Sequence, residues 1–101
     1  MNLVGCIYQV NIKDMSKIDY LVLGSLAKES LPLTGIMEKI STVNVEKVPT
    51  RIGIHARLKK LNEAGFIVFS WEQGKKVYSS TVKGNVNFRK FVNQLTRLAA
   101  A

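Results

Sequence analysis

The residue types in this sequence that could do chemistry gather between positions 50 and 60, where cations alternate with small and polar side chains. Lysine and arginine can neutralise phosphates and donate to base edges, and short side chains let a helix approach the floor of a DNA groove. The residues of this segment that we expect to contact DNA are Thr50, Arg51, Ile52, His55, Ala56, Lys59 and Lys60. The alternative is an ordinary solvated helix surface.

A second pair of cations, Lys75 and Lys76, lies where the second of two β-rich segments, at residues 66–71 and 76–81, begins. A short link that contains glycine between two such segments predicts a hairpin. Cations at its tip would meet the phosphate backbone. Beside the turn, Trp71 is expected to pack across the hairpin against Tyr78, and stacking on a sugar or base is the less favoured alternative.

The charge balance is strongly basic and uneven along the chain. The 101 residues include 15 Lys and Arg and 7 Asp and Glu, for a net charge of +8, and the whole surplus lies in residues 47–101. Such a distribution predicts a basic face and a polyanionic partner, which charge alone leaves open as nucleic acid or an anionic membrane surface. A purely solubilising surface is the competing interpretation.

Residue content argues against catalysis and metal binding. The chain has one His, one Cys, no phosphate-loop glycine pattern and no close pair of carboxylates on one face. We therefore expect no enzyme activity, no cofactor and no metal site. The single Cys6 cannot form an intramolecular disulfide, and the apolar stretches fall far short of the roughly 18 residues that span a bilayer. A cytoplasmic protein is expected.

The elements that must position these residues follow from apolar periodicity and capping signals, which predict one α+β domain. Alternation over residues 4–12 predicts a strand, and Ser16 is expected to cap a helix over residues 17–28. Pro32 then restricts residues 31–33 to a short extended piece. Thr34 is the expected cap of a second helix, whose apolar residues are Ile36, Met37 and Ile40.

The third helix is predicted to open at Pro49 and Thr50 and to end at Gly65. Its buried stripe is expected to consist of Ile54, Leu58 and Leu61. That stripe leaves the residues proposed for DNA contact on the opposite face. The hairpin follows, and after Gly84 a last helix is expected, capped by Asn85 or Asn87.

The last helix presents an apolar stripe that we expect to hold a homodimer together. Its members are Phe88, Phe91, Val92, Leu95 and Leu98. In so small a domain such a stripe either covers the core or pairs with a copy of itself. Intramolecular packing therefore stands as the alternative to dimerisation.

The order helix, short strand, helix, helix and hairpin is that of a winged helix-turn-helix, and several segments resemble one group of regulators. Residues 49–67 look like the recognition helix of PadR-like and MarR-like repressors, with a basic pair, Leu, two polar residues and Gly before an apolar strand. Residues 20–26 with 31–35 are similar to the PadR-like first helix and its turn. Residues 76–78 and 81–84 resemble the second wing strand and its exit.

The resemblance implies a three-helix core with a β-hairpin wing at residues 16–84. An N-terminal strand extension at 1–14 and a C-terminal dimerisation helix at 85–98 would complete a single domain. The resemblance also implies a function, that of a transcriptional regulator which binds double-stranded DNA sequence-specifically as a homodimer and is expected to be a repressor. The third helix would enter the major groove and the wing would meet the backbone or minor groove. The rivals are a non-specific architectural DNA-binding protein and a winged-helix module for protein or RNA interaction.

Overall fold

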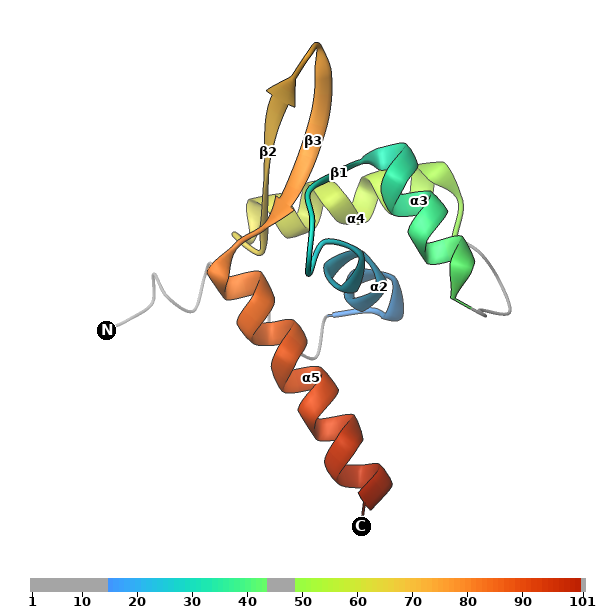
Figure 1. Cartoon of the computed structure of the whole chain (residues 1–101), viewed down its shortest axis with the longest axis vertical. Coiled ribbons are helices and arrows are strands. Elements are labelled where there is room, and N and C mark those ends of the chain that lie inside the picture. The colour runs from blue at the N-terminus through green and yellow to red at the C-terminus, as the bar shows by residue number, and fades with distance from the viewer. Residues whose placement is uncertain (1–14, 44–48, 101) are drawn as a thin grey trace.

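The computed structural model describes residues 15–43 and 49–100. Within these ranges four helices accompany a three-stranded antiparallel sheet (Figure 1). The elements are α2 (Lys17–Ser25), β1 (Leu31–Pro32), α3 (Leu33–Thr42), α4 (Arg51–Glu63), β2 (Ile67–Glu72), β3 (Lys75–Ser80) and α5 (Val82–Ala100). The α+β class and the winged-helix order are as the sequence predicts. The strand expected at residues 4–12 lies outside the described residues.

Helix α2 begins with the predicted cap. The hydroxyl of Ser16 accepts from the Asp19 N–H, and the Asp19 carboxylate accepts from the Ser16 N–H at 2.9 Å, which completes a capping box. The helix ends at Ser25, three residues before the predicted end. The chain leaves the helix here because residues Leu31 and Pro32 must reach β3, opposite Tyr78 and Val77.

Helix α3 begins one residue before the expected cap. Leu33 already lies in the helix and Pro32 occupies the N-cap position with extended backbone, so Thr34 comes too late to cap. In α4 the hydroxyl of Thr50 accepts from the Gly53 N–H at 3.0 Å, so Thr50 is the N-cap and Pro49 precedes the helix rather than standing in its first turn.

A glycine ends α4, as predicted. Gly65 has a φ of +85° and follows the C-cap residue Ala64. Its N–H donates to the Asn62 carbonyl, and the N–H of Phe66 donates to the Leu61 carbonyl, the paired bonds of a Schellman motif. This left-handed position turns the chain directly from α4 into the wing.

The wing is a hairpin with a two-residue turn, tighter than the predicted link. Gln73 and Gly74 have φ values of 53° and 77°, and Glu72 stands opposite Lys75 in the register. Further down, Tyr78 faces Phe69, and their rings pack edge to face at 6.3 Å. The expected packing of Trp71 against Tyr78 is therefore replaced by Phe69, because Phe69 is the direct cross-strand neighbour.

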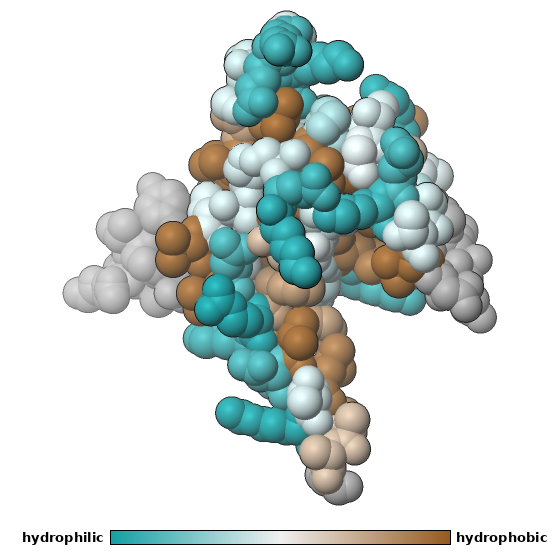
Figure 2. All heavy atoms as spheres, viewed as in Figure 1, coloured by the Kyte–Doolittle hydropathy of each residue, from teal (hydrophilic) through white to brown (hydrophobic). Residues whose placement is uncertain are grey.

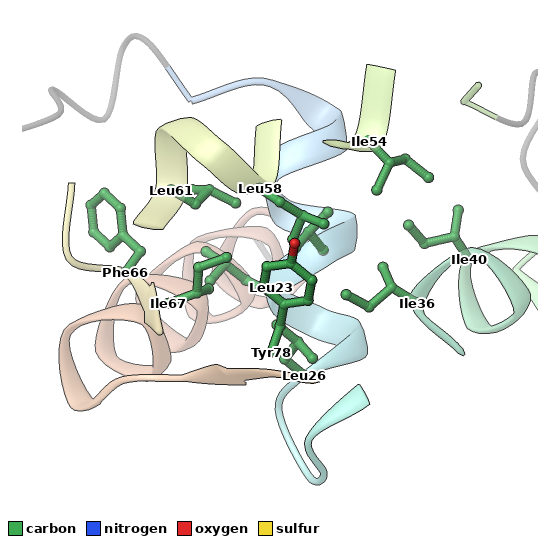
Figure 3. Packing of buried hydrophobic residues seen from close by; sticks show 11 residues of the cluster. Leu23, Leu26, Ile36, Ile40, Ile54, Leu58, Leu61, Phe66, Ile67 and Tyr78 are labelled. Atoms are coloured by element: carbon green, nitrogen blue, oxygen red, sulfur yellow. The ribbon is translucent and has the colours of Figure 1, made fainter. Parts of the chain in front are cut away.

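One hydrophobic cluster holds the helices and the base of the wing together (Figure 3). Its members are Val22, Leu23, Leu26, Ile36, Ile40, Ile54, Leu58, Leu61, Phe66, Ile67 and Tyr78. The predicted stripe of α4 is confirmed, since Ile54, Leu58 and Leu61 are all buried in this cluster. Burial of this stripe leaves the opposite side of α4 to solvent.

Helix α5 begins at Val82, so Gly84 lies inside the helix rather than before it. The Thr81 hydroxyl accepts from the Gly84 N–H at 3.1 Å, which makes Thr81 the capping residue in place of Asn85 or Asn87. The same hydroxyl lies 2.7 Å from the Gly65 carbonyl oxygen. A Cβ on Gly84 would lie 2.1 Å from the carbonyl oxygen of Phe66. The glycine is needed because α5 passes against the backbone that leaves α4.

The two halves of α5 have different surroundings. The first half packs on α2, where the rings of Phe91 and Tyr20 stack with centroids 3.9 Å apart and the Phe88 ring lies against Gly24. The second half extends away from the rest of the molecule (Figure 1). Hydrophobic side chains follow this helix outward from the body in the space-filling view (Figure 2).

Candidate nucleic-acid interface

The outer face of α4 carries the residues predicted to contact DNA. The structure places all of the following on the surface: Thr50, Arg51, Ile52, His55, Ala56, Lys59 and Lys60. Ile52, the largest apolar member, is 83% exposed. The face therefore combines cations with small and apolar side chains, the mixture that a helix needs to contact phosphates, base edges and thymine methyl groups.

A bidentate ion pair fixes this helix to α2. The Nε and Nη2 atoms of Arg57 each donate to a carboxylate oxygen of Asp19 at 2.6 Å, and Asp19 is fully buried. Hydrogen bonding to the Asp19 carboxylate raises the pKa of Arg57, burial lowers it by a smaller amount, and the negative charge of Asp19 adds to the increase. Arg57 is thus bound to α2 and orients α4.

The remaining cations of the outer face form no ion pair with an acidic side chain of the described residues. Within residues 15–43 and 49–100 the ion pairs are Arg57 with Asp19 and Lys39 with Glu29. Arg51, Lys59 and Lys60 take part in neither pair, and their charges add along one side of the helix.

The two wing lysines differ in their surroundings. Lys75 is exposed at the turn, whereas Lys76 is partly buried. The Nζ atom of Lys76 lies 4.1 Å from the centroid of the Phe69 ring and 5.5 Å from that of Tyr78. These cation–π contacts hold the ammonium group close to the strand surface, in a defined position. Nothing in the sequence places Phe69 beside Lys76, because the register pairs Lys76 with Trp71 and only the side-chain conformation of Lys76 brings its Nζ over the Phe69 ring.

Lys83 binds the C-terminal end of α4. Its Nζ donates to the Ala64 carbonyl at 2.9 Å and lies 4.7 Å from the centroid of the Phe66 ring. A cation at the carbonyl end of a helix is favoured by the helix dipole. Part of the basic surplus of the second half therefore stabilises the end of α4.

Comparison with solved structures identifies the architecture. The chain resembles PadR from Bacillus subtilis, solved in complex with operator DNA, with a TM-score of 0.69 and 28% identity over 77% of this chain. The fold is the PadR-type winged helix. The match covers 48% of that PadR chain, so our chain spans about half its length. The predicted PadR-like resemblance is confirmed, and the MarR-like resemblance stays a prediction.

Two further structures share the PadR-type fold. A PadR-family transcription regulator from Clostridium difficile matches with a TM-score of 0.69 at 15% identity, over 85% of this chain and 100% of its own. A transcriptional regulator from Clostridium thermocellum matches with a TM-score of 0.71 at 14% identity, over 99% of this chain and 91% of its own. No protein-family model matches the sequence, and no curated protein matches it either.

The apolar stripe of α5 divides within this PadR-type fold. Phe88 and Phe91 are partly buried against α2 of the same chain, as the intramolecular alternative requires. Val92, Leu95 and Leu98 are exposed, Leu98 by 74%. Three apolar residues in successive turns thus form a stripe that the rest of the described chain does not cover.

The described part of the chain contains neither a membrane-spanning helix nor a metal-binding cluster. None of the helices in the described ranges combines the length and the apolar content needed to cross a bilayer. Across the same residues, no group of three or more His, Cys, Asp or Glu side chains is arranged to hold a metal ion.

Proposed function

We propose that this chain is a transcriptional repressor that binds a specific double-stranded DNA site as a homodimer. The observation that carries the proposal is the exposed basic face of α4, held in place by the Arg57–Asp19 ion pair on a PadR-type fold. The similarity to a PadR bound to operator DNA supports duplex DNA as the partner.

In the proposed complex, α4 enters the major groove by its first turns. Arg51 and His55 project there and would read base edges, and Lys59 and Lys60, further along the helix, would meet phosphates. Lys75 and Lys76 of the wing would add contacts to the neighbouring backbone, where cations supply affinity and little sequence information.

The proposed dimer forms through the outer half of α5. Val92, Leu95 and Leu98 would pack against the same residues of a second copy, with Phe91 and Phe88 bracing the helix against α2. A two-fold dimer presents two copies of α4 and so matches a two-fold symmetric DNA site.

The remaining expectations belong to the same proposal. The chain would act in the cytoplasm, without enzyme activity and without a cofactor. Residues 1–101 would form one domain, in which an N-terminal extension at 1–14 and a helix at 85–98 flank the winged-helix core at 16–84.

Selection of bound sequences from a random pool of duplexes tests the proposal. We expect an enriched sequence with two-fold symmetry, bound at least about 1,000-fold more tightly than random duplex at physiological salt. A ratio near one, with binding that remains strong at low salt, would replace the repressor with an architectural DNA-binding protein. Absence of duplex binding at low salt would favour the protein or RNA module.

A further inference from the structure

The wing carries a tryptophan that the fold does not use. Trp71, in β2, is 67% exposed and stands opposite Lys76 near the tip of the hairpin. A two-stranded ribbon gains little stability from a large aromatic ring left in water. Tryptophan is enriched among the residues that contribute most of the energy at binding surfaces.

The neighbouring side chains leave the indole uncovered. Lys76 is the direct cross-strand neighbour of Trp71, but its ammonium group lies over the ring of Phe69, two residues closer to the base of the wing. The aromatic and cation–π contacts of the wing in the described chain involve Phe69, Tyr78 and Lys76. None of them includes Trp71.

Strand alternation sets the side of the wing on which Trp71 lies. Ile67, Phe69 and Trp71 share one face of β2, and Ile67 is fully buried in the cluster that contains Leu58 and Leu61 of α4. Trp71 therefore lies on the helix-facing side of the hairpin, further along β2 than the buried residue Ile67.

We propose that Trp71 packs its indole against the sugar and base edges of the minor groove beside the groove that α4 enters. The inference rests on the proposed function. Duplex DNA is the occupant because Lys75 and Lys76, which flank the indole, complement phosphate charge. The indole offers a flat apolar face to deoxyribose and one N–H donor, and the minor groove presents base acceptors to such a donor.

The chain contains a single tryptophan, so intrinsic fluorescence reports on this position alone. A fluorescein-labelled duplex of random sequence, at low salt, gives binding by anisotropy independently of the tryptophan. We expect the duplex to quench the fluorescence of Trp71 in parallel with the anisotropy change. Acrylamide, a neutral quencher that leaves the ionic strength unchanged, quenches the exposed indole of the free protein and should lose most of its effect in the complex.

Variants separate the role of the ring from that of the strand. Trp71→Ala should weaken duplex binding about 5- to 30-fold, and Trp71→Phe should lose less, because a ring remains to pack. Val68→Ala is the matched control, since Val68 is half exposed on the opposite face of the same strand. It should retain affinity within about twofold and keep the quenching.

The outcomes distinguish the inference from the proposed function. A wild-type protein that produces no anisotropy change overturns both. Binding with unaltered fluorescence, full acrylamide access and a Trp71→Ala affinity within about twofold of the wild type overturns the inference alone. A loss as large in Val68→Ala as in Trp71→Ala also overturns it, because the effect would then come from the strand and not from the indole.

Discussion

The buried carboxylate of Asp19 accepts two 2.6 Å hydrogen bonds from Arg57, which joins the first turn of α2 to the middle of α4. The same carboxylate accepts from the backbone N–H of Ser16. One side chain therefore caps one helix and orients another. Because Arg57 lies on α4 between the buried stripe and the outer face, this pair sets the direction in which that face is presented.

Replacement of Asp19 by Asn should destabilise the protein strongly. Asn can still accept from Ser16, but it leaves the guanidinium of Arg57 without its charged partner, at a cost of about 2 to 4 kcal/mol in the free energy of unfolding. Glu29→Gln, which breaks the exposed pair with Lys39, is the matched control and should cost less than about 1 kcal/mol. Urea unfolding of both variants makes the comparison, and equal losses would contradict the structural role of Asp19.

Gly84→Ala should be among the most damaging single-methyl additions. The new Cβ would lie 2.1 Å from the Phe66 carbonyl oxygen, so the backbone of α5 or of the turn after α4 must shift. We expect a loss of about 3 kcal/mol in thermal or urea unfolding. Asn93→Ala, at an exposed position of the same helix, should change stability little or raise it slightly. Similar stability in the two variants would show that the close approach is not maintained in solution.

Leu95→Asp combined with Leu98→Asp should convert the proposed dimer to a folded monomer. Both side chains are exposed in the folded chain, so their replacement should leave its fold intact. In a dimer the new carboxylates would be buried at the interface without a partner of opposite charge, which is unfavourable. Sedimentation velocity measures the change, with circular dichroism to confirm the fold. Asn93→Asp, which lies off the apolar stripe, should remain dimeric, and a wild type that sediments as a monomer would exclude this interface.

Arg51 and the wing lysines should contribute differently to DNA binding. Arg51→Ala should lose about 1 to 3 kcal/mol for the selected site and much less for random duplex, because it removes a base contact. Lys75→Ala with Lys76→Ala should weaken both duplexes alike and flatten the plot of log affinity against log salt by about 0.9 per lost phosphate contact. Titrations of both duplexes over a salt series separate the two patterns. If Arg51→Ala lowered the affinity for every duplex equally, Arg51 would contact phosphates and not bases, and α4 would bind the DNA backbone without reading its sequence.

Alkaline pH should loosen the contact between α2 and α5. Burial raises the pKa of Tyr20 above its ordinary value of 10.0, and the charge of Asp19 adds to that shift. The folded chain thus holds the phenol proton more tightly than the unfolded chain. The contribution of protonated Tyr20 to the free energy of unfolding is complete below pH 10.0, the ordinary pKa, and is lost as the pH rises through the raised pKa of the folded chain. Tyr20→Phe should reduce this part of the alkaline loss of stability in urea unfolding, and an unchanged pH profile would contradict the assignment.

The sequence predicts the features that depend on near neighbours. Ser16 caps its helix as expected, and Ile54, Leu58 and Leu61 form the buried stripe, because caps and helical periodicity are local properties. That stripe suffices to place the outer face of α4, so most of the candidate site follows from it.

The features that the sequence does not predict depend on distant contacts. Arg57 meets Asp19 across 38 positions, and no local pattern distinguishes it from the free cations beside it. Gly84 is expected to mark a helix boundary, yet a glycine is needed there because the Phe66 carbonyl of another segment leaves no room for a Cβ. The pairing of Lys76 with Phe69 in preference to Trp71 is a choice of side-chain conformation that strand spacing does not determine.

The contact between Gly84 and the end of α4 has a consequence for the spacing of the DNA site. Thr81 and Lys83 donate hydrogen bonds to carbonyl oxygens of residues 64–66. These bonds fix the start of α5 against the end of α4. In the proposed dimer the distance between the two copies of α4 would then be set by the angle between α4 and α5 and by the apolar stripe on α5. A protein built in this way tolerates few half-site separations, and one inserted base pair between half-sites would cost it most of its affinity.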